Sequence, residues 1–307
     1  PELAIGNIVG SNISNVLLVL GLASITVPLL VSRTLVRVTV PLMIAVTGLV
    51  WWISLDGTID RLEGLGLLTG AVVFSVVTVA RSRRATTAAL AQSRKNEPLG
   101  APRNKTAGTV LNLCAIAAGL VLLVLGAGWL VEGASEVARL LEISELIVGL
   151  TVVAVGTSLP EIATSMVAGL RGHRDIAVGN VVGSNIFNLL LVLGFCATVA
   201  PQPIAVPESA LRFDIPIMFG VSLACWPIFF TGWIIDRGEG LAFLGFYATY
   251  TVFLYLKATE HTALDPFLTT MAYVILPCTA LLLTVLTFRH WRNGAPDSLN
   301  TTHSDRR

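Results

Sequence analysis

Long apolar segments recur along this chain, and they restrict its possible folds more than any other feature. Nine of them are about 20 residues long, the length that an α-helix needs to cross a bilayer. Charged residues make up 13% of the chain, against about 25% in soluble domains. The sequence therefore predicts an all-α polytopic membrane protein. The nine predicted spans are approximately 7–31, 36–55, 62–80, 109–131, 144–170, 176–200, 213–235, 239–257 and 266–288.

The charged residues indicate how these spans are oriented. The linker 81–108 carries seven Lys and Arg residues and one acid, Glu97. Because cytoplasmic loops are enriched in Lys and Arg, we expect this linker in the cytoplasm, and the acidic stretch 132–145 outside. We expect a multi-pass protein of the cytoplasmic (inner) membrane, and the net charge of +1 gives no indication of nucleic-acid binding. The cytoplasmic side then also holds Arg33, Arg37, Arg171, Arg174, Arg289 and Arg292.

One apolar stretch, 148–194, contains a helix-breaking motif in its first half. Pro160 lacks an amide hydrogen, and its ring clashes with the carbonyl of Gly156, so the helix is predicted to break or kink there. Carbonyls freed at such a break are tolerated in a membrane only where protein or a water-filled site satisfies them.

The same motif is rich in oxygen. Thr157, Ser158 and Glu161 supply two hydroxyls and one carboxylate, which are hard ligands of the kind that Ca²⁺ prefers and that would also suit Na⁺. Ionisable groups at bilayer depth are costly and usually line an ion path, although Glu161 at an exposed helix end is the alternative. The motif favours a cation site within the membrane.

The second half of the stretch places further polar side chains on one helix face. Asn180, Ser184 and Asn188 are spaced by four residues, and so are Gly179 and Gly183, a pattern that lets another helix approach closely. For any single one of these polar residues, a hydrogen bond between helices is the alternative to an ion site.

An internal repeat relates the two halves of the chain. Residues 4–21 match residues 177–194 at an offset of 173, and residues 60–64 match residues 236–240 at an offset of 176. The charge-derived orientation places the two copies in opposite senses across the membrane. Inverted repeats are typical of transporters, whose substrate site lies at the midplane junction of the repeats.

These motifs resemble those of the cation/Ca²⁺ exchanger superfamily, and within it the prokaryotic sodium/calcium exchanger proteins. The resemblance rests on GTSLPE at 156–161, on GNVVGSNIFN at 179–188 and on the first-half copy of the latter, and it covers about residues 1–258. It implies an inverted-repeat exchanger fold. It also implies a set of cation ligands, namely Glu161, Asn188, Thr157, Ser158, Ser184, the carbonyl of Ala154, Ser11 and Asn15.

The first repeat lacks its own copy of the Gly-Thr-Ser-x-Pro-Glu motif. Pro1 and Glu2 are no substitute, because the repeat offset aligns them with Arg174 and Asp175 in a loop. The chain thus resembles an N-terminally truncated exchanger. It would lack the first helix and the second, motif-bearing helix, and would carry one extra C-terminal helix.

The resemblance implies a secondary active antiporter that exchanges Ca²⁺ for Na⁺ by alternating access, with these ions as cargo and no cofactor. We expect a first repeat at 1–80, a cytoplasmic linker at 81–108, a second repeat at 109–258, and an added helix with a disordered tail at 259–307. A proton-coupled cation exchanger and an inactive fragment or assembly partner remain alternatives. No enzyme is expected, because the four histidines lack metal spacing and no nucleophile–base pair is evident.

Overall fold

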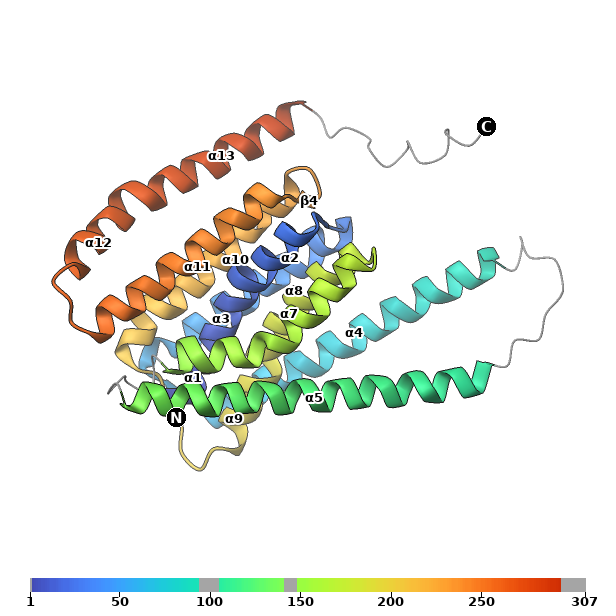
Figure 1. Ribbon diagram of the computed structural model, residues 1–307, viewed down its shortest axis with the longest axis horizontal. Helices are drawn as coiled ribbons and strands as arrows, with labels where there is room; N and C mark the ends of the chain where they lie inside the picture. The colour runs from blue at the N-terminus through green and yellow to red at the C-terminus, as the bar shows by residue number, and fades with distance from the viewer. Residues whose placement is uncertain (1, 94–104, 141–147, 294–307) are drawn as a thin grey trace. The chain divides into compact units, whose positions relative to one another are not determined.

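The computed structural model describes residues 2–93, 105–140 and 148–293 of the protein, and these residues are almost entirely helical (Figure 1). The first repeat region contains α1 (Glu2–Ser14), η1 (Asn15–Val19), α2 (Leu20–Thr26), β1 (Leu29–Leu30), η2 (Leu35–Thr39), α3 (Val40–Ile53), η3 (Ser54–Asp56), β2 (Thr58–Ile59) and α4 (Arg61–Ser93). The second contains α5 (Lys105–Leu140), η4 (Gly149–Val153), α7 (Ala154–Leu170), α8 (Arg174–Phe187), η5 (Asn188–Val192), α9 (Leu193–Val199), β3 (Ile204–Ala205), η6 (Ala210–Asp214), α10 (Ile215–Phe230), β4 (Ile234–Ile235) and α11 (Arg237–Ala258). It is followed by α12 (Leu264–Thr270), η7 (Met271–Ile275) and α13 (Leu276–Asn293).

Eight helical segments of the described residues are long and apolar enough to cross a membrane, and they coincide with eight of the nine predicted spans. The remaining predicted span, 109–131, lies within α5, where only the shorter stretch Ala117–Gly133 is apolar. The prediction of a polytopic helical membrane protein is therefore confirmed. Part of the predicted linker is helical, because α4 continues to Ser93. The predicted disordered tail lies outside the described residues except for Asn293.

The chain forms two compact units, and each unit takes segments from both sequence repeats. Unit 1 consists of Pro1–Asn12, Val46–Pro160 and Ser184–Pro216. Unit 2 consists of Ile13–Ala45, Glu161–Gly183 and Ile217–Arg307. The repeats are therefore units of sequence, whereas the compact units are assembled by exchange of helices between repeats.

The same helix crossing occurs once in each unit, with the roles of the repeats exchanged. In unit 1, α4 packs along η5 and α9, and in unit 2, α11 packs along η1 and α2. A Cβ atom on Gly194 would lie 3.0 Å from the carbonyl oxygen of Gly64, and one on Gly21 would lie 3.2 Å from that of Gly240. These four glycines are repeat equivalents, so their retention in both halves follows from the close approach of two helix backbones.

Short strand pairs beside these crossings obey the same symmetry. In unit 2, β1 pairs with β4, with Leu29 opposite Ile235, and in unit 1, β2 pairs with β3, with Ile59 opposite Ile204. All four of these side chains are buried. The internal repeat predicted from the sequence is thus present in the register of the strands as well as in the helices.

The repeated Asp-Arg-x-Glu-Gly sequences begin the two long crossing helices. Asp60 and Asp236 each accept a hydrogen bond at Oδ1 from the backbone N–H three residues later, at 2.8 and 2.9 Å. Glu63 and Glu239 each accept one in return from the backbone N–H of the aspartate, at 2.9 and 3.0 Å. This reciprocal arrangement is a capping box, which explains why the acid pair recurs at the same offset.

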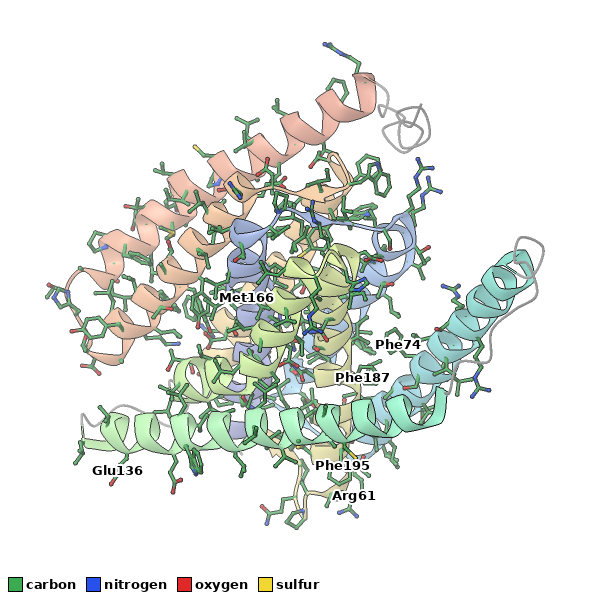
Figure 2. All side chains as sticks on the ribbon, turned by 45° about the vertical axis from the view of Figure 1, so that its right-hand side comes forward. Arg61, Phe74, Glu136, Met166, Phe187 and Phe195 are labelled. Atoms are coloured by element: carbon green, nitrogen blue, oxygen red, sulfur yellow. The ribbon has the colours of Figure 1, made fainter. Side chains whose placement is uncertain are left out.

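Aromatic packing adds to the contacts within unit 1. Phe74 of α4 and Phe187 at the end of α8 meet edge to face with ring centroids 5.4 Å apart (Figure 2). The C-terminal segment of unit 2 is different, because none of the most apolar window of Leu264–Val285 is buried within the structure. Its side chains therefore present an apolar surface suited to lipid.

The predicted break at Gly156–Pro160 is absent, which corrects the sequence-based expectation. The α-helix α7 is continuous through Pro160, and the irregular turn lies just before it, in the π-helix η4. Two hydroxyls donate back to carbonyls of this region, Ser158 to Ala154 at 2.8 Å and Thr157 to Val153 at 3.0 Å. Neither is the carbonyl that Pro160 leaves without its helical donor, which is that of Gly156. Proline is tolerated in membrane helices where local π adjustments and neighbouring groups accommodate it.

A close helix approach occurs at Gly10 but not at its repeat equivalent Gly183, where the sequence predicted one. A Cβ atom on Gly10 would lie 2.7 Å from the carbonyl oxygen of Leu150 and 2.8 Å from the Cβ of Ala154. At Gly183 no described atom lies within 4 Å of such a Cβ.

We therefore expect Gly10→Ala to destabilise the protein by about 1–3 kcal/mol, because the added methyl group overpacks a backbone contact. The repeat-matched control, Gly183→Ala, should leave stability unchanged or raise it slightly, since alanine favours a helix over glycine. Thermal unfolding of the detergent-solubilised variants measures both, and an equal loss in the two would contradict this account of the packing.

Candidate functional site

Thr157 lies at the centre of an oxygen cluster in unit 1. Its Oγ1 is 2.8 Å from Ser11 Oγ and 3.0 Å from Asn7 Oδ1. The same atom is 3.0 Å from the carbonyl oxygen of Val153 and 3.2 Å from that of Ala154. Residues from α1 and from the start of α7 are therefore brought together around one hydroxyl.

This cluster contains more oxygen atoms than hydrogen atoms that could link them. Ser11 Oγ is also 3.2 Å from Asn7 Oδ1, so three side-chain oxygens form a triangle with hydrogen-bond distances on every edge. The two hydroxyls carry one hydrogen each, and the amide oxygen carries none, so at most two of the three edges can be hydrogen bonds at once. Converging lone pairs of this kind are what a hard cation uses.

Burial differs across the cluster. Ser158, which is 1% exposed, donates to the carbonyl of Ala154 at 2.8 Å, whereas the neighbouring Thr157 is exposed. Ser11 is 5% exposed. The cluster thus has a buried protein side and one hydroxyl that is open to its surroundings, as an ion-binding group must be.

Two buried asparagines mark the symmetry axis of the repeat. Asn185 Nδ2 donates to the backbone carbonyl of Asn12 at 3.2 Å, and Asn12 Nδ2 donates to the carbonyl of Ile8 at 3.1 Å. Asn12 and Asn185 are repeat equivalents, 173 residues apart, so their contact places the local pseudo-twofold axis between them. Asn12 Oδ1 is buried and accepts no hydrogen bond from the residues that the structure describes.

Ser11 directly precedes Asn12 in the chain. The oxygen cluster of Thr157 therefore lies next to the point where the two repeats meet in unit 1. That is the position at which inverted-repeat transporters form their substrate sites.

Glu161 follows Pro160 on α7 and is the first residue of its segment of unit 2. Its side chain is half-buried, and the carboxylate oxygen Oε2 is completely buried. On the helix it comes one turn after Thr157, which places the two residues on one helix face.

Asn180, which the sequence analysis placed on the polar face of its helix, connects α8 to α7 in unit 2. Its Nδ2 donates to Thr164 Oγ1 at 3.0 Å and to Ser165 Oγ at 3.3 Å. Asn180 therefore forms hydrogen bonds between helices, which the sequence analysis gave as the alternative to an ion site.

The asparagines predicted as ligands each begin a π-helix. Asn15 starts η1 and Asn188 starts η5, and in each case the carbonyl accepts the N–H of the residue five positions later. Such π-turns are rare and occur frequently at functional sites. Because the two π-turns begin at residues 173 positions apart, the irregular turn is a feature of both repeats.

The predicted ligands therefore fall into two groups. The described contacts bring Ser11, Thr157, Ser158 and Ala154 together in unit 1, which also contains Ser184 and Asn188 on α8 and η5. Asn15 and Glu161 belong to unit 2. Among the described residues no three His, Cys, Asp or Glu side chains form a group that could hold a metal, so the cluster is built mainly of neutral oxygens.

The sequence analysis missed Asn7 as a member of the cluster. Two signals pointed to it, because Asn7 is the repeat equivalent of Asn180 and lies one turn before Ser11 on the same helix. Its role became visible only when the hydroxyl of Thr157 was found against it.

Comparison with known proteins identifies the family of the chain. The family model described as sodium/calcium exchanger protein matches residues 1–80 and 111–256. The chain belongs to the sodium/calcium exchanger protein family. Members of this family are transporters rather than enzymes, and they carry ions as cargo. The matched residues omit all of the predicted linker 81–108 and all of α12–α13.

Similar proteins include two from bacteria. The inner membrane protein YrbG of Escherichia coli K12 is 34% identical over 227 residues, which are 73% of this chain and 69% of that protein. The putative antiporter CaxA of Alkalimonas amylolytica is 36% identical over 73% of this chain and 68% of its own. A solved structure of the sodium-calcium exchanger NCX_Mj superposes with a TM-score of 0.63 at 27% identity, covering 82% of this chain and 77% of that one.

Removal of the Thr157 hydroxyl should weaken cation binding. We expect Thr157→Val to lower the apparent affinity for Ca²⁺ or Na⁺ about tenfold, or about 1.4 kcal/mol, because an oxygen at the centre of the cluster is lost without a change in shape. The shift of thermal unfolding with increasing cation concentration measures this affinity.

The matched control is Thr198→Val, since the Thr198 hydroxyl only donates to the carbonyl of Gly194 within its own helix, at 2.7 Å. Its cation dependence should remain that of the unmodified protein. Equal behaviour of the two variants would remove Thr157 from the site.

Proposed function

We propose that this protein is a secondary active antiporter that exchanges Ca²⁺ for Na⁺ across the cytoplasmic membrane by alternating access. The observation that carries the proposal is the hydrogen-poor oxygen cluster of Asn7, Ser11 and Thr157 beside the contact between Asn12 and Asn185. Family membership and the likeness to the sodium-calcium exchanger NCX_Mj support it. The cytoplasmic membrane is favoured by the positive-inside pattern and by the relative named as an inner membrane protein.

We further propose that the cation is held by the oxygens of eight residues. Glu161 supplies charge, and the neutral oxygens replace water around the ion, as expected for a hard cation. Ca²⁺ and Na⁺ would compete for the same oxygens, and this mutual exclusion would couple their fluxes. The eight residues are Ser11, Asn15, Ala154, Thr157, Ser158, Glu161, Ser184 and Asn188.

The division into repeats at 1–80 and 109–258 is part of the same proposal. Each compact unit contains helices of both repeats, and the chain passes from one unit to the other within helices such as α7. Alternating access in repeat-built transporters arises when one helix group moves against another around a fixed site.

Glu161→Gln is expected to abolish Ca²⁺ uptake into Na⁺-loaded proteoliposomes, because glutamine keeps the shape of the side chain and removes its charge. The matched control is Glu136→Gln on α5, an exposed acid labelled in Figure 2, which should retain uptake. Radiolabelled Ca²⁺ flux is the measurement. Unchanged flux in the Glu161 variant would contradict the assignment of the site.

The same assay identifies the coupling ion. Uptake driven by a pH gradient in Na⁺-free buffer, with none driven by Na⁺, would move the assignment to a proton-coupled exchanger. Absence of flux under both gradients would favour an inactive fragment or a role as an assembly partner.

A further inference from the structure

A tryptophan occupies a left-handed backbone position at the end of α10 in unit 2. Trp233 has φ 59°, a conformation that bulky residues rarely adopt. Its repeat equivalent at the offset of 176 is Gly57, with φ 85°. The backbone carbonyls of the two residues accept equivalent hydrogen bonds. Val31 N–H donates to the carbonyl of Trp233 at 2.8 Å, and Val206 N–H donates to the carbonyl of Gly57 at 2.9 Å. Glycine meets this requirement without strain, so the indole of Trp233 is retained for a reason other than the turn.

The surroundings of the indole contain an arginine. The Arg33 guanidinium carbon lies 5.7 Å from the centre of the Trp233 ring, within the range of a cation–π interaction. Phe230 packs on the same indole with ring centroids 5.9 Å apart. Trp233 Nε1 is buried and donates no hydrogen bond to any residue that the structure describes, so the indole contributes its ring rather than its N–H. The aromatic pair thus holds Arg33 at the beginning of a membrane-spanning helix.

Arg33 and its neighbour Arg37 form a pair of like charges one helical turn apart. Both are exposed, and no carboxylate lies within 4 Å of either in the described part of the chain. At the equivalent helix start of the second repeat, Glu208 and Arg212 form an ion pair at 2.6 Å. The first repeat therefore lacks the acid that neutralises this turn in the second.

Two cations in this position are unfavourable for the isolated protein. Like charges four residues apart on a helix repel each other, and positive charge in the first turn opposes the helix dipole. The arrangement becomes favourable when an anion lies between the guanidinium groups.

The neighbouring loop in unit 2 adds positive charge. Arg171 and Arg174 follow α7. The helices on either side of this loop pack against the segment that contains Arg33, since a Cβ on Gly169 would lie 3.8 Å from Leu29 and one on Gly179 would lie 3.8 Å from Leu35. The exposed His173 lies in the same loop. The nearby acids are Asp175, Asp236 and Glu239, of which the last two are engaged in the capping box of α11.

We propose that Arg33, positioned by the Trp233 ring, and Arg37 bind the phosphate headgroup of an anionic phospholipid at the predicted cytoplasmic surface of the membrane. Guanidinium groups match phosphate oxygens in a bidentate geometry, and tryptophan is enriched at the level of lipid headgroups. The site lies where the helix that includes Leu35–Asp56 enters the bilayer, so that the lipid's acyl chains would extend along the apolar helix surface. This proposal does not rest on transport activity.

The first test is lipid retention measured by native mass spectrometry. The protein is reconstituted in nanodiscs that contain phosphatidylglycerol and phosphatidylcholine. After the protein is released from the nanodisc in the mass spectrometer, the number of lipid molecules of each kind that remain bound to it is counted. The unmodified protein should retain phosphatidylglycerol preferentially. The double variant Arg33→Gln/Arg37→Gln should lose this preference at least tenfold.

The repeat provides a matched control at the same place in the other helix start. Glu208→Gln/Arg212→Gln removes a neutral ion pair and should retain phosphatidylglycerol as the unmodified protein does. Trp233→Gly restores the residue that the first repeat uses in this turn, so the variant should fold while its preference for the anionic lipid falls.

Three results would overturn the proposal. The first is equal retention of phosphatidylglycerol by the Arg33/Arg37 variant and the unmodified protein, and the second is an equal loss in the Glu208/Arg212 control. The third is a shift of thermal unfolding by millimolar inorganic phosphate in lipid-free detergent that depends on Arg33 and Arg37, with no preference for phosphatidylglycerol in nanodiscs, because the anion would then be free phosphate.

Discussion

The need to satisfy every backbone and side-chain oxygen away from water governs this structure. In the hydrocarbon region no solvent compensates a freed carbonyl, so hydroxyls and π-turns must do so. In the turn before Pro160, the hydroxyls of Thr157 and Ser158 point back to the carbonyls of Val153 and Ala154. The same hydroxyl of Thr157 also lies against Ser11 and Asn7, so these side chains form a group of oxygens with too few hydrogens. The candidate site thus shares its hydroxyl with the backbone of its own helix.

The internal repeat organises the scaffold around this cluster. Glycine crossings, capping boxes and strand pairs occur twice, and each crossing and each strand pair combines elements from both repeats. The contact between Asn12 and Asn185 lies where the copies meet. Positions at which the two repeats differ are informative, because the same residue would serve the scaffold equally well in both halves. Gly10 makes a close approach that Gly183 does not, and Trp233 replaces a glycine that the turn would accept more easily.

Much of the fold could be predicted from the sequence because lipid imposes simple rules. Eight spans, the repeat offsets and the oxygen-rich motif follow from apolar length and residue type. The break at Pro160 was predicted wrongly, since the proline rule describes an isolated helix, whereas α7 continues through the proline with a π-turn just before it. Asn7 was missed because its partner Thr157 is 150 residues away in the chain. The predicted roles of Glu161 and Asn188 as ligands remain proposals.

By itself, the sequence determined the class of protein, the pairing of its halves and its membership of an exchanger family, because hydrophobic length and repeated motifs are properties of the linear chain. Only the tertiary structure decided which oxygens meet, where the helix irregularity falls, and that each compact unit exchanges helices between repeats. These features depend on distances between residues far apart in the chain. Whether a hydroxyl takes part in a cation site or only donates a hydrogen bond within its own helix depends on which residues pack against it.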